Sequence, residues 1–332
     1  MEPPITHVHV ERMDEDLVVS WRGGDADVAV FLSDSADDAG LDLRDADRPG
    51  HVILRRVPVT PRPYVHLLAG DGPFVIAAER RVPLEGAHNF RDLGGYRGDG
   101  GRTVRWGRLY RSDHLGGLTD ADLEAITQLG IELVVDYRGP HEHETTPSRI
   151  AVDGPIRRHD RAIGDGTVEG VSLWDSIMAG TLAGFDEDDL AGFYRATLRS
   201  AADVFGEVLT LLAEPDHLPA VFHCTAGKDR TGLTAALLLA TLGVGDGDIL
   251  DDYELSNRYR SAVRLAEIEP ALAENGIDIE RFLPLFTAPR RAMATALARL
   301  REEHGSVEAY LTGTAGVAPT TLGALRDHLL VR

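Results

Sequence analysis

The sequence predicts two domains of different class: an antiparallel β-sandwich over residues 1–83 and an α/β domain over residues 84–332. Before residue 84, short apolar runs alternate with turn-rich acidic stretches, and no helical period appears. After it, strand-like runs alternate with helical ones, as in a central, mostly parallel sheet flanked by helices. At 332 residues, the chain is also long enough to bury a core in each of two domains.

The sandwich prediction depends on six apolar runs and the turns between them. Trp21, in the second run, is the expected centre of the core. The pattern is similar to that of a fibronectin type III module, which implies a structural role or a protein partner rather than catalysis. The six runs are residues 8–10, 17–21, 28–32, 51–54, 64–68 and 74–78.

The α/β domain contains a helix whose two ends are marked in the sequence. Thr119 is a typical N-cap with Asp122 three residues later, and Gly130 is a typical stop. The apolar run 131–135 predicts a buried strand, so Asp136 is expected at the carboxyl end of that strand. Functional side chains of parallel sheets gather at this edge.

The second half of the chain is predicted to be mainly helical. Residues 186–213 predict one long or broken helix, and residues 250–300 and 307–330 add further helices around the sheet. The glycine-rich, acidic segment 163–189 is either a mobile lid or a plain surface connection.

The most informative feature is the spacing of Cys224 and Lys228, the only cysteine and the only lysine of the chain. Every other basic residue is arginine, which cannot replace lysine as a compact point charge. No other side chain supplies a thiolate nucleophile. The alternative for a lone cysteine is a small buried hydrophobic residue.

The neighbouring sequence favours an anion-binding loop around this cysteine. Residues 218–222 predict a buried strand and residues 231–242 a buried helix that stops at Gly243. Loop and helix-start N–H groups can then converge on an anion, and they would stabilise a thiolate. Gly227 lets the backbone approach where a side chain would meet a ligand. Arg230 can return along the first helical turn as a bidentate phosphate donor.

Two other kinds of site are excluded by single residues. Phe222 occupies the position of the first glycine of a Walker A loop. A structural zinc site needs more than the one cysteine of this chain. We therefore expect no metal and no cofactor.

Residues 223–232 (HCTAGKDRTG) resemble the signature loop of cysteine-dependent phosphatases. The GKDRTG form is similar to that of the bacterial tyrosine/serine protein phosphatase family of dual or triple specificity. The resemblance runs from about residue 84 to the C-terminus, and Tyr137 stands where the family usually has leucine. Four further segments match in order: residues 89–96, 108–112, 134–138 with Glu142, and 252–257.

The resemblance implies a reaction through a phosphocysteine intermediate. Cys224 would attack phosphorus, and water would then hydrolyse the intermediate. Arg230 and the loop N–H groups would hold the phosphate oxygens. Thr231 would hydrogen-bond the sulfur and make it a better leaving group. The substrate-binding loop would comprise Thr225, Ala226, Gly227 and Lys228.

The general acid has two candidates. Asp136 is the first choice, because the resemblance and its place at a strand end both point to it. Asp229, inside the loop, is the second. For either carboxylate, the alternative is an ion pair with a nearby arginine.

Several residues are expected to support the site. Arg138 and Glu142 would brace it, and His223 would fix the loop with its ring turned away. Arg91 and Asp92 form either an internal ion pair in a turn or a ligand contact. The alternating His141 and His143 are interpreted as a solvated loop, not a metal site.

The amino-acid composition limits which kinds of binding partner and which cellular compartment we expect for the protein. A net charge of −20 argues against nonspecific binding to nucleic acid or anionic membranes. No stretch reaches the roughly 18–20 apolar residues of a membrane span. The N-terminus lacks signal-peptide features, and a free thiol suits the cytoplasm, with export by another route left open.

The leading substrates are proteins carrying phosphotyrosine, with phosphoserine and phosphothreonine next. Phosphoinositides are an alternative, because Lys228 adds positive charge within the loop. A sulfurtransferase and a phosphate-binding pseudoenzyme are the alternatives from other classes.

Overall fold

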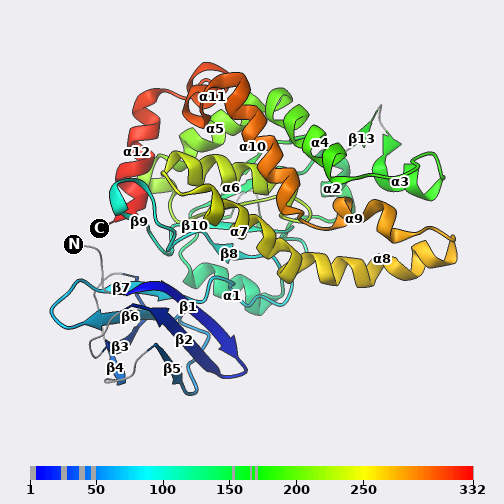
Figure 1. The fold of residues 1–332 in the computed structure, drawn as a ribbon. Helices are drawn as coiled ribbons and strands as arrows, with labels where there is room; N and C mark the ends of the chain where they lie inside the picture. The colour runs from blue at the N-terminus through cyan, green and yellow to red at the C-terminus, as the bar shows by residue number, and fades with distance from the viewer. Residues whose placement is uncertain are drawn as a thin grey trace.

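The computed structural model describes residues 5–23, 28–36, 42–45, 50–151, 154–164, 167–168 and 171–331. It contains an N-terminal pair of antiparallel sheets and a larger α/β part, which lie against each other (Figure 1). The expected combination of an all-β part followed by an α/β part is confirmed at this level.

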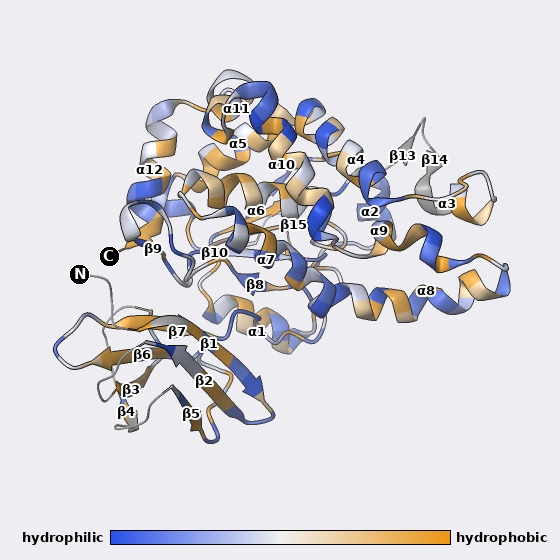
Figure 2. Cartoon of the chain, in the orientation of Figure 1, coloured by the Kyte–Doolittle hydropathy of each residue, from blue (hydrophilic) through white to orange (hydrophobic). Residues whose placement is uncertain are grey.

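Seven strands among the described residues form the N-terminal part. Buried and partly buried positions alternate along the second strand, so that Leu17, Val19 and Trp21 all enter the core as expected. Hydrophobic residues run along these strands in Figure 2. One sheet is ordered β1 (Thr6–Met13), β2 (Asp16–Arg22), β5 (His51–Leu54); the other is β4 (Asp42–Asp45), β3 (Val28–Ser33), β6 (Tyr64–Ala69), β7 (Val75–Ala78).

A five-stranded sheet lies at the centre of the α/β part. Four of its strands are parallel, and the short β8 at one edge runs antiparallel to β10. Because parallel strands end at the same edge, Ser112, Asp136 and His223 lie in register beside one another. The order is β12 (Arg157–Asp160), β11 (Leu133–Asp136), β15 (Ala220–His223), β10 (Leu109–Ser112), β8 (Arg91–Asp92).

Apolar side chains from both faces of this sheet are buried against helices. Phe222 packs in the larger cluster with α6 and the later helices, whereas Val221 faces the cluster that includes Ile126 of α1. The expected cap of α1 (Asp120–Gln128) is present, because Thr119 and Asp122 form a reciprocal capping box. The other helices of the larger cluster are α4 (Glu187–Ser200), α5 (Ala202–Leu212), α6 (Asp229–Thr241), α7 (Asp246–Ser256), α10 (Arg290–His304), α11 (Val307–Gly313) and α12 (Pro319–Leu329).

A smaller group of helices packs beside the sheet and is called here the helical lobe. It consists of α3 (Leu173–Met178), α8 (Ala262–Glu274) and α9 (Leu283–Phe286), with the residues between α8 and α9 (Figure 1). Its own apolar cluster contains Ile177, Ile268, Leu272 and Phe282. The proposed lid, 163–189, lies partly outside the described residues, and its described end packs into this cluster.

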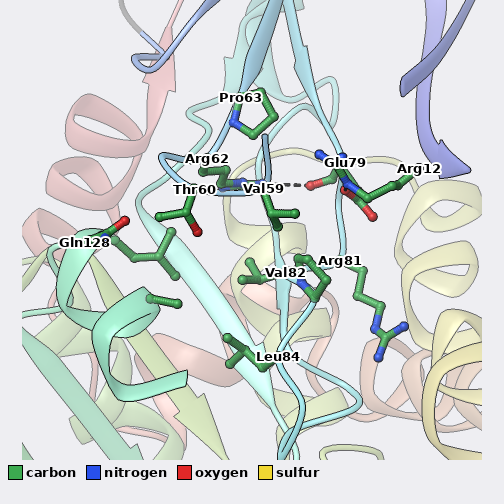
Figure 3. A pocket seen from close by; sticks show the side chains of 13 residues that line it. Arg12, Val59, Thr60, Arg62, Pro63, Glu79, Arg81, Val82, Leu84 and Gln128 are labelled. Carbon is green, nitrogen blue, oxygen red and sulfur yellow. Dashed lines mark hydrogen bonds and ion pairs between the residues drawn. The ribbon is translucent and has the colours of Figure 1, made fainter. Parts of the chain in front are cut away.

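Arg62 links the sandwich to the α/β part. Its Nη1 donates to the Asp92 carboxylate and the Tyr110 hydroxyl, and its Nη2 donates to the Glu79 carbonyl oxygen. Figure 3 shows this arginine beside a small hollow, with the Glu79 side of the sandwich on one side and the end of α1 on the other. The hollow is lined by Arg12, Val59, Thr60, Arg62, Pro63, Glu79, residues 81–84, Ala125, Gln128 and Leu129. Among the described residues, no helix combines the length and apolar character needed to cross a membrane.

Candidate active site

The signature residues lie on a tight loop between β15 and α6. The strand ends at His223 and the helix begins at Asp229, so the predicted strand, loop and helix are all present. Cys224 is the first residue after the strand and is only 2% exposed. Arg230 lies in the first turn of α6. The backbone N–H groups of a first helical turn have no partners within the helix.

Gly227 allows the loop to pack against the end of β10. Its φ is +65°, and a Cβ atom there would lie 2.3 Å from the carbonyl oxygen of Ser112 and 2.6 Å from the nitrogen of Asp113. The glycine is therefore required by neighbouring backbone, whereas the sequence suggested that a side chain would meet a ligand.

The carbonyl groups of the loop are held from one side. Asn89 Nδ2 donates to the carbonyl oxygens of Ala226 at 2.9 Å and Gly227 at 3.2 Å. Arg111 Nη2 donates to the same Gly227 oxygen at 2.7 Å. No described acceptor engages the N–H groups of residues 225–228, so these donors are available to an anion.

A buried ion-pair network supports these donors. Arg91 Nε and Arg111 Nη1 lie 3.1 Å and 2.6 Å from the two carboxylate oxygens of Asp252, and all three side chains are at most 1% exposed. Burial alone would raise the pKa of Asp252, but Arg91 and Arg111 outweigh it and lower that pKa to about 2. The internal ion pair considered for the 91–92 turn is not formed, since Asp92 pairs with Arg62.

Asn89, Arg111 and Asp252 are site residues that sequence reasoning did not select. All three lie inside segments that resemble the phosphatase family, and this was the only signal that could have identified them. Their roles depend on contacts across more than a hundred residues of chain, such as the 161 between Arg91 and Asp252.

The Glu142 carboxylate forms a bidentate ion pair with the guanidinium of Arg230. Nη1 donates to Oε2 at 2.7 Å and Nη2 to Oε1 at 2.6 Å, and the Thr225 hydroxyl also donates to Oε1. Burial alone would raise the pKa of Glu142, but Arg230 lowers it to about 2. For Arg230, Glu142 and the nearby Cys224 more than offset burial and raise the pKa. Glu142 thus braces the predicted phosphate clamp.

Asp136 lies in a different environment from the one a general acid needs. Arg138 Nη2 lies 2.8 Å from its Oδ2, and His223 Nε2 lies 3.4 Å from the same atom. Burial alone would raise the pKa of Asp136, but His223 and Arg138 outweigh it and lower the pKa to about 2. The carboxylate is fully buried against Arg138, so the geometry favours the ion-pair alternative.

His223 fixes the loop from the strand side. Its Nδ1 lies 3.2 Å from the carbonyl oxygen of Cys224, and its ring is fully buried. Burial lowers the pKa of His223 to about 4, even though Asp136 opposes the shift. The ring is therefore neutral at pH 7 and adds no positive charge beside the thiol.

Asp229 is the second carboxylate candidate, and it is accessible. Its side chain is 28% exposed at the start of α6. The Tyr194 hydroxyl donates to its Oδ1 at 2.5 Å, which sets the direction of the carboxylate. Such an oriented and solvent-accessible group can exchange a proton with a substrate.

Lys228 has several hydrogen-bond partners, whereas the Thr231 hydroxyl has none among the described residues. The ammonium of Lys228 donates to backbone carbonyl groups of the helical lobe, so it lies away from the position expected for a phosphate contact. The Thr231 hydroxyl is fully buried and has no hydrogen-bond partner among the described residues, the Cys224 sulfur included.

Asp136, His143 and Asp160 bring their ligand-type atoms within 4.8 Å of one another. Arginines fill this cluster: Arg158 Nε lies 2.7 Å from Asp160, and its Nη2 lies 3.1 Å from His143 Nδ1. A site already neutralised by guanidinium groups suits a metal cation poorly. His143 belongs to α2 (Pro140–Thr145), where a solvated loop was expected.

Comparison with known proteins agrees with this geometry. The model of the tyrosine phosphatase family matches residues 82–331. A protein of Cupriavidus necator named as a tyrosine-protein phosphatase is 32% identical over 267 residues, which cover 80% of this chain and 94% of that protein. The triple specificity protein phosphatase PtpB of Mycobacterium tuberculosis is 30% identical over 290 residues, covering 74% and 98%. The chain therefore belongs to the tyrosine phosphatase family.

Proposed function

We propose that this enzyme hydrolyses phosphomonoesters on proteins, phosphotyrosine first and phosphoserine or phosphothreonine second, through a phosphocysteine intermediate. The observation that carries the proposal is the arrangement around Cys224. A buried thiol begins a loop whose N–H groups at 225–228 have no described acceptor, and Arg230 follows on the first helical turn. Such a cradle matches the charge of a phosphoryl group in transfer.

The first step forms a bond from the Cys224 sulfur to phosphorus and breaks the ester P–O bond. Arg230 and the loop N–H groups stabilise the equatorial oxygens. We assign the proton donor for the leaving oxygen to Asp229, because its carboxylate is 28% exposed and is oriented by Tyr194 and Lys228, whereas Asp136 is fully buried beside Arg138.

The second step reverses these roles. Water attacks phosphorus, Asp229 accepts its proton, and the S–P bond breaks to release inorganic phosphate and the thiolate. We assign the hydrogen-bond donor for the leaving sulfur to the Thr231 hydroxyl, which is buried and has no partner among the described residues.

The test of the nucleophile is hydrolysis of an aryl phosphate with EDTA present, by wild type and by Cys224→Ser. Loss of turnover in the variant, with a folded protein, supports the proposal. Equal turnover in both proteins would overturn it. A rapidly quenched wild-type reaction with labelled substrate should also contain phosphocysteine.

The general acid is tested by Asp229→Asn and Asp136→Asn in parallel. For Asp229→Asn, we expect kcat to fall about 10²-fold for alkyl-like leaving groups and much less for acidic phenols, because good leaving groups need no proton. A similar leaving-group dependence for Asp136→Asn alone would reverse the assignment.

Three further assignments accompany this proposal. Residues 1–83 form a fibronectin type III-like domain and residues 84–332 the phosphatase domain; the β1-β2-β5 and β4-β3-β6-β7 sheets support this division. Phosphorylated proteins are the partners. A reducing cytoplasm is the compartment, since it keeps the single cysteine a free thiol.

A further inference from the structure

We infer that Lys228 is a positioning residue that joins the signature loop to the helical lobe, and that it makes no contact with the substrate phosphate. Its side chain is 4% exposed although it belongs to the phosphate-binding loop. The ammonium Nζ lies 3.1 Å from the carbonyl oxygens of Pro284 and Leu285 and 2.7 Å from that of Thr287. This inference rests on the proposed function of the loop.

The contacts account for every donor that the ammonium has. A lysine ammonium carries three N–H groups, and three carbonyl oxygens at the end of α9 receive them. The Asp229 carboxylate, 3.1 Å away, is a fourth acceptor on the protein. No N–H remains for a phosphate oxygen while these contacts persist.

The geometry also explains why this position is the only lysine of the chain. Carbonyl groups at a helix end carry partial negative charge and converge on one point. A tetrahedral ammonium can donate to all three, but a planar guanidinium presents its donors in one plane and needs more room. Arginine, used at every other basic position, does not match this site.

The carbonyl segment that binds Lys228 is itself held on its far side. Asn257 Nδ2 donates to the carbonyl oxygen of Ala288 at 2.9 Å, and the Ala288 N–H donates to Asn257 Oδ1 at 2.6 Å. Lys228 thus connects this fixed segment to the signature loop. Asp229, the proposed proton donor, is the next residue of the chain. Loss of this connection should release both the loop and the carboxylate from their positions.

The inference bears on the substrate class. If Lys228 does not contact phosphate, it gives no advantage to a multiply phosphorylated lipid headgroup over a single phosphate. The phosphoinositide alternative depended on the charge of this residue, so it loses its main support.

The wild-type protein provides the first test, because one lysine gives one signal. Protein labelled with ¹⁵Nζ-lysine should show a single ammonium resonance with slow proton exchange. Saturating inorganic phosphate or vanadate should leave its chemical shift nearly unchanged, while the amide signals of residues 225–230 move. A large ammonium shift on adding either anion would overturn the inference. Anion binding that moves neither set would count against the proposed function instead.

Variants provide the second test. We expect Lys228→Met and Lys228→Arg both to lower kcat about tenfold or more, the size expected for losing hydrogen bonds of a charged group, with KM nearly unchanged. The loss should be equal for an aryl phosphate and a soluble phosphoinositide, and amide exchange of residues 285–288 should be faster. Propylammonium should partly restore kcat to Lys228→Ala, whereas guanidinium should not. A selective rise of KM for the phosphoinositide, with unchanged exchange, would contradict the positioning role.

Discussion

Arg230 and Glu142 form a bidentate pair at the mouth of the signature loop, with N–O distances of 2.7 and 2.6 Å. The carboxylate takes one donor from each terminal nitrogen. The Nε–H of Arg230 has no hydrogen-bond partner among the described residues, so it stays available to a phosphate oxygen. Glu142 therefore orients the clamp without consuming all of its donors.

Replacing this carboxylate should weaken catalysis. We expect Glu142→Gln to lower kcat/KM about tenfold or more, because a charged hydrogen-bond pair that orients Arg230 is replaced by a neutral amide. Steady-state kinetics on an aryl phosphate measure the effect. Glu144→Gln, an exposed change on the same helix, is the control and should be neutral. Higher activity of Glu142→Gln would show that Glu142 competes with substrate.

Asp252 should be essential to stability. We expect Asp252→Asn to reduce the free energy of unfolding by about 3–5 kcal/mol, because it leaves Arg91 and Arg111 buried without their counter-charge. Urea denaturation at pH 7 measures this. Asp251→Asn, which alters the exposed neighbour paired with Arg290, should change stability by less than about 0.5 kcal/mol. Equal effects of the two changes would contradict the buried network.

His223 should make the fold sensitive to mild acid. Its pKa is about 4 in the folded protein and about 6.5 when unfolded, so only the unfolded chain gains a proton between these values. The contribution of His223 to the free energy of unfolding is therefore complete above pH 6.5. As the pH falls toward 4, the free energy of unfolding decreases by roughly 3 kcal/mol. Urea midpoints at pH 7, 6, 5 and 4 should show the decline.

His223→Gln is the matched variant for this titration. It should be less stable at pH 7 but lose less stability between pH 6.5 and 4 than wild type does. Parallel decline of both proteins would assign the acid sensitivity to other groups.

The contact between Arg62 and Asp92 should couple the N-terminal sheets to the α/β part. We expect Arg62→Met to destabilise the protein by about 3–5 kcal/mol, since Asp92 would be left buried without its counter-charge. Thermal unfolding followed by calorimetry measures the loss. Arg55→Met removes an exposed ion pair on the sandwich, with Asp16, and should have little effect. An Arg62→Met variant as stable as wild type would contradict this coupling role of Arg62.

Local signals in the chain were sufficient for the strand, loop and helix around Cys224. The apolar runs before and after it act through neighbours in sequence, and the structure contains both the strand and the helix. The need for Gly227 is tertiary, because a Cβ atom there would meet the backbone of Ser112. The strand β4 (Asp42–Asp45) was missed, because its charged sequence has no apolar alternation. Pairing with β3 makes it a strand.

Sequence alone determined that an all-β part precedes an α/β part, and it determined the family resemblance and the position of the signature loop. The reason is that hydrophobic period, turn residues and a continuous motif are properties of short segments. Tertiary structure decided the partners of the buried charges. Asp136 is paired with Arg138, Arg91 reaches Asp252, and Lys228 binds the end of α9. These choices follow from which groups packing removes from water together, because a buried charge must find its partner in space.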